Sequence, residues 1–137
     1  ITVAQHWQDW ANPTMVILVL NNRDLNFVTW EQRGMQGEPK FEPSQRLPDV
    51  SYAAFAHMLG LEGVRIEDPG QMGAAWDRAL AARKPFVLEV LADPNVPPFP
   101  PHIVDAQAEQ ARAAQRKGDP EAGDVERGLR QQGGAGA

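Results

Sequence analysis

The sequence predicts an α/β fold, in which a parallel sheet with flanking helices is followed by a proline-rich segment and a mostly exposed C-terminal tail. Two largely apolar runs, over residues 15–20 and 86–91, have the length of strands rather than of helices, and residues 64–66 are a shorter strand candidate. Stretches with helical spacing of apolar residues separate these runs. Strands that alternate with helices form parallel sheets with right-handed crossovers, so a layered α/β domain is expected.

Spaced apolar residues predict one helix before the first strand, two between the first and second strands, and one before the third. These helices are expected over residues 1–10, 24–35, 52–59 and 69–83, with a proline-containing loop over residues 37–48. Asp68 can cap the last of them, and Lys84-Pro85 ends it. Glu89 interrupts the third strand and, since a buried charge needs partners, we expect a hydrogen bond to a residue such as Arg65.

The composition excludes several classes of function. The net charge is −5 and the pI is about 5.1, which argues against a nucleic-acid-binding surface. There is no cysteine, so disulfides, thiolate metal sites and cysteine nucleophiles are excluded. The longest apolar run has six residues, whereas a membrane span needs about 20. No signal peptide is visible, and a cytoplasmic location is expected.

The chain changes character near residue 93. Five of the nine residues over 93–101 are proline, so this stretch is expected to run extended. Residues 105–137 contain no aromatic residue, and their large aliphatic residues are Val125 and Leu129. We therefore expect a domain over residues 1–104 and an extension over residues 105–137. The extension is expected to be helical over 105–117, disordered from Gln131, and to contribute little to a core.

Two asparagines mark the place where chemistry is expected. Asn21 and Asn22 follow the most hydrophobic strand directly, and ligands of open parallel sheets bind at the carboxyl ends of strands. Asparagine and main-chain carbonyl oxygens are hard ligands that suit Mg²⁺, and the helix that follows favours an anion at its N-terminus. Asparagine is also a common turn residue, and from this pair alone a plain turn is the favoured interpretation.

The neighbouring residues add a family resemblance. Residues 18–31, Leu-Val-Leu-Asn-Asn-Arg-Asp-Leu-Asn-Phe-Val-Thr-Trp-Glu, closely resemble the end of the cofactor motif of the thiamine-diphosphate-dependent enzymes of the acetolactate synthase and pyruvate oxidase group. Further resembling segments cover residues 37–41, 47–49, 55–56, 59–61, 75–76, 79–80, 83–85, 93–98 and 117–121. Together they span nearly the whole chain.

The resemblance implies a partial thiamine-diphosphate-binding domain and a set of site residues. The family motif begins with Gly-Asp-Gly and ends with Asn-Asn, and it binds Mg²⁺. Carried onto this sequence, Asn22 supplies a side-chain oxygen and Asp24 a main-chain oxygen, while Leu25 and Phe27 line the cofactor pocket or pack the helix onto the sheet. No Gly-Asp-Gly precedes Asn21, so we expect a truncated copy or a partial record of a longer enzyme.

The resemblance also implies an activity for the full-length enzyme. It would decarboxylate a 2-keto acid, with pyruvate as the expected substrate, in the manner of a pyruvate oxidase, a quinone-linked pyruvate dehydrogenase or an acetolactate synthase. A homo-oligomer, dimer or tetramer, is expected, and FAD is allowed in the full-length enzyme. We assign no catalytic residue to this chain, because the family's activating glutamate lies in another domain, and we expect the chain alone to be inactive.

Two other hypotheses remain open. The chain can be a non-catalytic module for subunit association that derives from such an enzyme. A nicotinamide- or nucleotide-binding domain on a similar sheet is the second, and the absence of a Gly-x-Gly-x-x-Gly segment after a strand counts against it.

Overall fold

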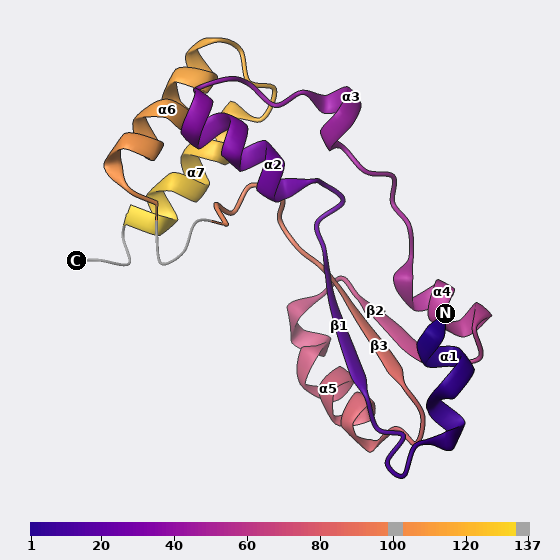
Figure 1. Ribbon diagram of the computed structural model, residues 1–137. Helices are drawn as coiled ribbons and strands as arrows, with labels where there is room; N and C mark the ends of the chain where they lie inside the picture. Colours follow the sequence, from indigo (N-terminus) through magenta and orange to yellow (C-terminus); the bar gives the residue numbers. More distant parts are fainter. Residues whose placement is uncertain (99–102, 134–137) are drawn as a thin grey trace. The chain divides into compact units, whose positions relative to one another are not determined.

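The structure of the chain is a computed structural model that describes residues 1–98 and 103–133 (Figure 1). The chain forms two compact units. Unit 1 comprises Ile1–Asn21 and Asp49–Ala92, and unit 2 comprises Asn22–Pro48 and the chain from Asp93 onward. The segment that begins at residue 105 therefore shares a unit with residues 22–48.

Unit 1 contains the predicted parallel sheet. Over the described residues its strands are β1 (Val16–Asn21), β2 (Glu62–Ile66) and β3 (Phe86–Leu91). Their spatial order is β1-β3-β2, and both outer strands pair with β3 in parallel. The central place of β3 explains its nearly continuous apolar sequence, because a central strand is covered on both faces. The three predicted strands are thus confirmed.

Helices cover both faces of this sheet. They are α1 (Thr2–His6), the 3₁₀ turn η1 (Trp7–Asp9), α4 (Tyr52–Met58), the 3₁₀ turn η3 (Pro69–Gln71) and α5 (Met72–Ala81). Figure 1 shows α5 on one side of the sheet and α1 and α4 on the other. The predicted cap at Asp68 is present, since its Oδ1 accepts a hydrogen bond from the N–H of Gly70 at 2.9 Å. The Ser51 hydroxyl caps α4 in the same manner by accepting from the N–H of Ala54.

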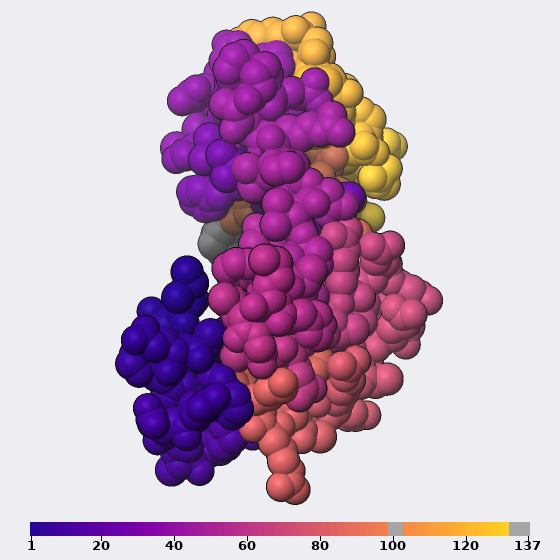
Figure 2. All heavy atoms as spheres, turned by 90° about the vertical axis from the view of Figure 1, so that its right-hand side faces the viewer, coloured from indigo at the N-terminus to yellow at the C-terminus, as the bar shows by residue number. Residues whose placement is uncertain are grey.

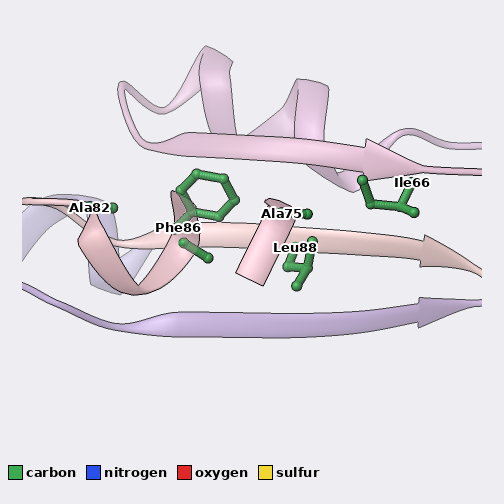
Figure 3. Close-up of a cluster of buried hydrophobic side chains, with 6 residues drawn as sticks. Ile66, Ala75, Ala82, Phe86 and Leu88 are labelled. Carbon is green, nitrogen blue, oxygen red and sulfur yellow. The ribbon is translucent and has the colours of Figure 1, made fainter. Parts of the chain in front are cut away.

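Alternation along β3 supplies a core to each layer. Phe86 and Leu88 face α5 and are buried with Ala75, Ala79 and other residues of that layer (Figure 3). Val87 points to the opposite face and is buried among residues of the α1 and α4 layer. Burial of a side chain the size of Phe86 or Leu88 contributes about 1.5–3 kcal/mol. The sheet is therefore held from both sides.

The α1 and α4 face is also hollowed. A hollow of about 190 Å³ is lined by residues of both helices and of the sheet, including Val3, Tyr52 and Phe55. Figure 2 shows the indigo N-terminal segment and the magenta α4 segment on the same side of unit 1. Close approach of α4 to β2 requires Gly63, because a Cβ there would lie 3.1 Å from Ala53 Cα, Ala53 O and Val87 O.

Unit 2 is helical in its described part. Its elements are α2 (Asn26–Glu31), the π-helix η2 (Gln32–Gln36), α3 (Glu42–Gln45), α6 (Asp105–Arg116) and α7 (Ala122–Gly133). The helix expected over residues 24–35 is thus present as α2 and η2, and the loop expected over 37–48 contains the short α3. A core of Trp30, Ala111, Val125 and Leu129 joins α2, α6 and α7.

The expectation that the C-terminal segment contributes little to a core is wrong. Ala111, Ala114 and Val125 are fully buried, and Leu129 is nearly so. Alanines on one face of α6 allow it to lie close against η2, and Trp30 from α2 supplies the large apolar surface that the segment itself lacks. The helix expected over 105–117 is confirmed by α6. Disorder is expected from Gln131; α7 extends to Gly133, and residues 134–137 lie outside the described residues.

Over the described ranges, no helix is both long enough and apolar enough to cross a bilayer.

Candidate functional site

The two adjacent asparagines have different surroundings. Asn21 ends β1 and is buried, and its Nδ2 donates to Glu89 Oε1 at 2.7 Å and to the carbonyl of Val50 at 3.1 Å. Glu89 also accepts from the Ser51 hydroxyl and from the N–H of Ala53, and Arg65 lies 3.7 Å from it. The predicted need of Glu89 for partners is confirmed, but its hydrogen bonds come from Asn21, Ser51 and Ala53, and Arg65 makes an ion-pair contact instead of the expected hydrogen bond. Asn21 therefore serves the interior of unit 1.

Asn22 begins unit 2 with a tight turn. Its Oδ1 accepts a hydrogen bond from the main-chain N–H of Asp24 at 3.1 Å. Between them, Arg23 adopts the left-handed conformation with φ 54, which is uncommon for a residue with a side chain. Residues held in such conformations need support from the surrounding structure, and they cluster at functional sites.

The support comes from an antiparallel bridge between Asp24 and Arg46. The N–H of Leu25 donates to Gln45 O at 2.8 Å, and the N–H of Leu47 donates to Arg23 O at 2.9 Å. In this kind of bridge the flanking residues carry the hydrogen bonds, so the N–H and C=O of Asp24 point away from the partner strand. The N–H reaches Asn22, and the C=O is directed outside the bridge.

The carboxylate of Asp24 is turned inward. Its side chain is only 2% exposed, Oδ1 accepts from the Thr29 hydroxyl at 2.6 Å, and Oδ2 lies 2.6 Å from Lys40 Nζ. The Lys40 contact is an ion pair whose geometry is not that of a well-directed hydrogen bond. Asp24 thus presents its main chain and its carboxylate to different surroundings.

The turn opens onto a hollow of about 390 Å³. It is lined by Asn22, Asp24, Leu25, Asn26, Phe27 and Val28. All four residues that the sequence indicated for cofactor binding, Asn22, Asp24, Leu25 and Phe27, therefore lie together. Asn22 is half-buried and Phe27 is 61% exposed, and the lining combines polar residues with the apolar Leu25, Phe27 and Val28.

A buried charge network, which sequence reasoning did not identify, lies behind the turn. Arg33 is fully buried and holds Asp119 through two hydrogen bonds, from Nε at 2.8 Å and from Nη2 at 2.9 Å. Arg33 Nη2 also donates to Glu121 at 2.9 Å. Lys40 Nζ donates to the other oxygen of Glu121 at 2.8 Å. The network therefore links the C-terminal segment to Asp24 through Lys40.

The network shifts the pKa values of its members. Burial by itself would raise the pKa of Asp119, but hydrogen bonds from Arg33 and from the N–H groups of Lys40 and Glu121 outweigh it, and the pKa is lowered. The pKa of Glu121 is lowered in the same way, because Lys40 and Arg33 outweigh the effect of burial. Burial would lower the pKa of Lys40, but its close contacts with the carboxylates of Asp24 and Glu121 outweigh burial, and the pKa is raised. All three groups are thus held in their charged forms.

Comparison with known families decides which class of protein carries this turn. The sequence model of a family described as "Thiamine pyrophosphate enzyme, C-terminal TPP binding domain" matches residues 9–90, which is more than half of the chain. The chain belongs to this family. Thiamine pyrophosphate is another name for thiamine diphosphate, so the resemblance to the cofactor-binding domain of thiamine-diphosphate-dependent enzymes is confirmed. Helices α6 and α7 lie beyond the matched range.

One relative of this chain is a protein of Bacillus subtilis (strain 168). It is named "Putative thiamine pyrophosphate-containing protein YdaP" and is 31% identical over 94 residues. The alignment covers 69% of this chain and 16% of the relative. The chain thus spans about a sixth of the length of the relative that it matches.

Proposed function

We propose that the turn over residues 22–24 binds the diphosphate of thiamine diphosphate through Mg²⁺. Asn22 supplies its side-chain oxygen and Asp24 its main-chain oxygen. Leu25 and Phe27 form the apolar wall beside the cofactor. The observation that carries the proposal is the turn itself, in which Asn22 Oδ1 and the Asp24 carbonyl belong to one strained segment that borders an open hollow.

The chemistry of the two donors fits the ion. Asn22 Oδ1 accepts one hydrogen bond, from Asp24, and a carbonyl oxygen has a second lone pair. Mg²⁺ takes oxygen ligands, keeps several waters, and is held by few protein groups together with phosphate oxygens. Among the described residues, no three or more His, Cys, Asp or Glu side chains come together in a way that could hold a metal instead.

When bound, thiamine diphosphate supplies the electron sink for decarboxylation of a 2-keto acid. The residues of this chain bind and orient: Asn22 and Asp24 hold the diphosphate end, and Phe27 and Leu25 keep water from the apolar side. No residue of the chain is assigned a proton transfer. For the full-length protein we propose a 2-keto acid decarboxylating enzyme, pyruvate oxidase-like or acetolactate synthase-like, that works as a homo-oligomer and can carry FAD.

A second candidate, a subunit-association module without catalysis, is favoured by the exposed apolar side chains of unit 2. Phe27, Val28 and Met35 are each about half exposed or more, and such side chains are typical of surfaces that meet a partner. The two candidates differ in one respect, because the module has no need of the cofactor.

Calorimetric titration of the full-length protein with thiamine diphosphate, with and without Mg²⁺, tests the proposal. We expect Mg²⁺-dependent binding that Asn22→Ala weakens by about tenfold or more, or about 1.4 kcal/mol or more. Asn12→Ala is the matched control, because Asn12 Oδ1 accepts from the N–H of Thr14 in an exposed turn of unit 1. Equal affinities in the wild type and Asn22→Ala would refute the assigned ligand, and no binding at all would favour the association module.

A further inference from the structure

Besides the Thr29 hydroxyl, one charged side chain contacts the buried carboxylate of Asp24. Lys40 is 3% exposed, and its Nζ lies 2.6 Å from Asp24 Oδ2 and 2.8 Å from Glu121 Oε1. We propose that Lys40 is a positioning residue for the turn over residues 22–24, and that through Glu121 it makes cation binding at this turn depend on the C-terminal segment. This inference rests on the proposed function.

The main chain of Lys40 is fixed by the same segment. Its N–H donates to Asp119 Oδ2 at 2.9 Å, so both ends of Lys40 are attached to residues 119–121. Lys40 is therefore not free to follow Asp24 if the conformation of the turn changes. The position of Nζ, and with it the position of the Asp24 carboxylate, is therefore set from the C-terminal side.

Arg33 makes a second connection between the turn and the C-terminal segment. It belongs to η2, which continues α2, and α2 begins two residues after Asp24. By holding Asp119 and Glu121, Arg33 ties the far end of this helical segment to the residues that hold Lys40. The turn is thus fixed at two places, through the helix that follows it and through the Asp24 carboxylate.

The arrangement explains how Asp24 can offer a main-chain oxygen. With its carboxylate engaged by Thr29 and Lys40 inside unit 2, the residue cannot swing the carboxylate outward without losing the hydrogen bond from the Thr29 hydroxyl and the ion pair with Lys40. Arg23, in the left-handed region, makes the turn dependent on such support. Loss of Lys40 therefore allows the Asp24 carbonyl to move from the direction in which a cation would meet it.

The test measures the apparent Kd of Mg²⁺ by calorimetric titration of the full-length protein in the presence of a fixed excess of thiamine diphosphate. We expect Lys40→Met to weaken Mg²⁺ binding about tenfold and Glu121→Gln to weaken it about threefold. Lys117→Met is the matched control, because Lys117 is a half-exposed lysine of the same unit that pairs with Glu38. It should bind as the wild type does.

A double variant separates positioning from mere stability. Asp24→Asn combined with Lys40→Met removes both charges of the pair and keeps an acceptor for Thr29, so we expect it to recover most of the lost affinity. Thermal unfolding of each ligand-free variant shows whether affinity follows stability. The inference is wrong if the wild type binds and folded Lys40→Met and Glu121→Gln bind equally well, or if the double variant recovers nothing. A wild type that does not bind Mg²⁺ would remove the proposed function as well.

If Lys40→Met does not fold, Lys40→Arg and Glu121→Gln decide the matter. Arginine keeps the charge but cannot place a single ammonium between two carboxylates, so reduced affinity in both folded variants supports the inference. Unchanged affinity in both overturns it.

Discussion

Arg33 and Asp119, which are 86 residues apart in the sequence, form a fully buried two-hydrogen-bond ion pair within unit 2. The pair joins the helical segment that follows the turn over residues 22–24 to the loop between α6 and α7. Planar guanidinium and carboxylate groups match in this geometry, and each remaining hydrogen-bonding position of the carboxylate is also used, by the N–H groups of Lys40 and Glu121. A charged contact of this kind fixes one arrangement of the chain.

Removal of one partner should therefore be costly. Asp119→Ala leaves the Arg33 charge buried with fewer partners, and we expect a loss of about 3–5 kcal/mol in the free energy of opening unit 2. Hydrogen exchange of the amides in α2 and α6 measures it. The control is Asp93→Asn, since Asp93 meets Arg127 in an exposed pair at 3.6 Å, and exposed pairs contribute about 1 kcal/mol or less. Equal losses in the two variants would contradict the assignment.

The lowered pKa values predict loss of stability in acid. Asp119 and Glu121 have folded-state pKa values below their ordinary values of 3.8 and 4.5, so their contribution is present above those values and disappears as the pH falls through the folded-state values. We expect the urea midpoint of unit 2 to drop steeply below about pH 4. Asp119→Asn should show a shallower drop, and an unchanged slope would argue against the network as its source.

The lack of space around Gly63 predicts that adding a single methyl group there lowers the stability of unit 1. The new Cβ of Gly63→Ala would meet main-chain atoms of Ala53 and Val87 at 3.1 Å, and main-chain atoms cannot turn aside. We expect a destabilisation of about 1–3 kcal/mol in urea unfolding followed by circular dichroism. Gly73→Ala is the control, because no atom lies within 4 Å of a Cβ in this helical position, and it should stabilise by about 0.5–1 kcal/mol.

The asparagine pair should separate into two phenotypes. Asn21→Ala removes the amide that satisfies Glu89 Oε1 inside unit 1, and we expect a loss of about 1–3 kcal/mol in urea unfolding. Asn22→Ala breaks one half-buried hydrogen bond and should cost about 1 kcal/mol or less. Stability and Mg²⁺-dependent binding should thus respond to different members of the pair. The opposite pattern would show that the two roles are exchanged.

Local pattern was enough to predict most of unit 1. The strands were recognisable because aliphatic runs of strand length stand between amphipathic helices, and Asp68 carried its own capping signal. That Glu89 needs partners could be predicted from its place in an apolar strand. The identity of its nearest partner, Asn21, could not be predicted in this way. These features depend on neighbours in sequence or on the period of one element.

Unit 2 was harder to predict because its folded arrangement depends on contacts between residues that are far apart in the sequence. Lys40 lies in a loop with no period, and its partner Glu121 is 81 residues away. The C-terminal segment has few large apolar residues, so composition favoured disorder, yet Trp30 and the small alanines of α6 supply a core together. The resemblance indicated the turn and its four site residues, and it carried no information on what holds Asp24 in place.

Trp30 gives unit 2 an optical signal of its own. The other tryptophans of the chain, Trp7, Trp10 and Trp76, all belong to unit 1. The Trp30 indole is fully buried, donates its N–H to Pro94 O at 3.2 Å and lies with its ring 5.3 Å from the Arg33 guanidinium. In a variant in which the other three tryptophans are replaced, the emission wavelength of Trp30 would report the hydration of the α2 and α6 interface in real time, independently of the sheet.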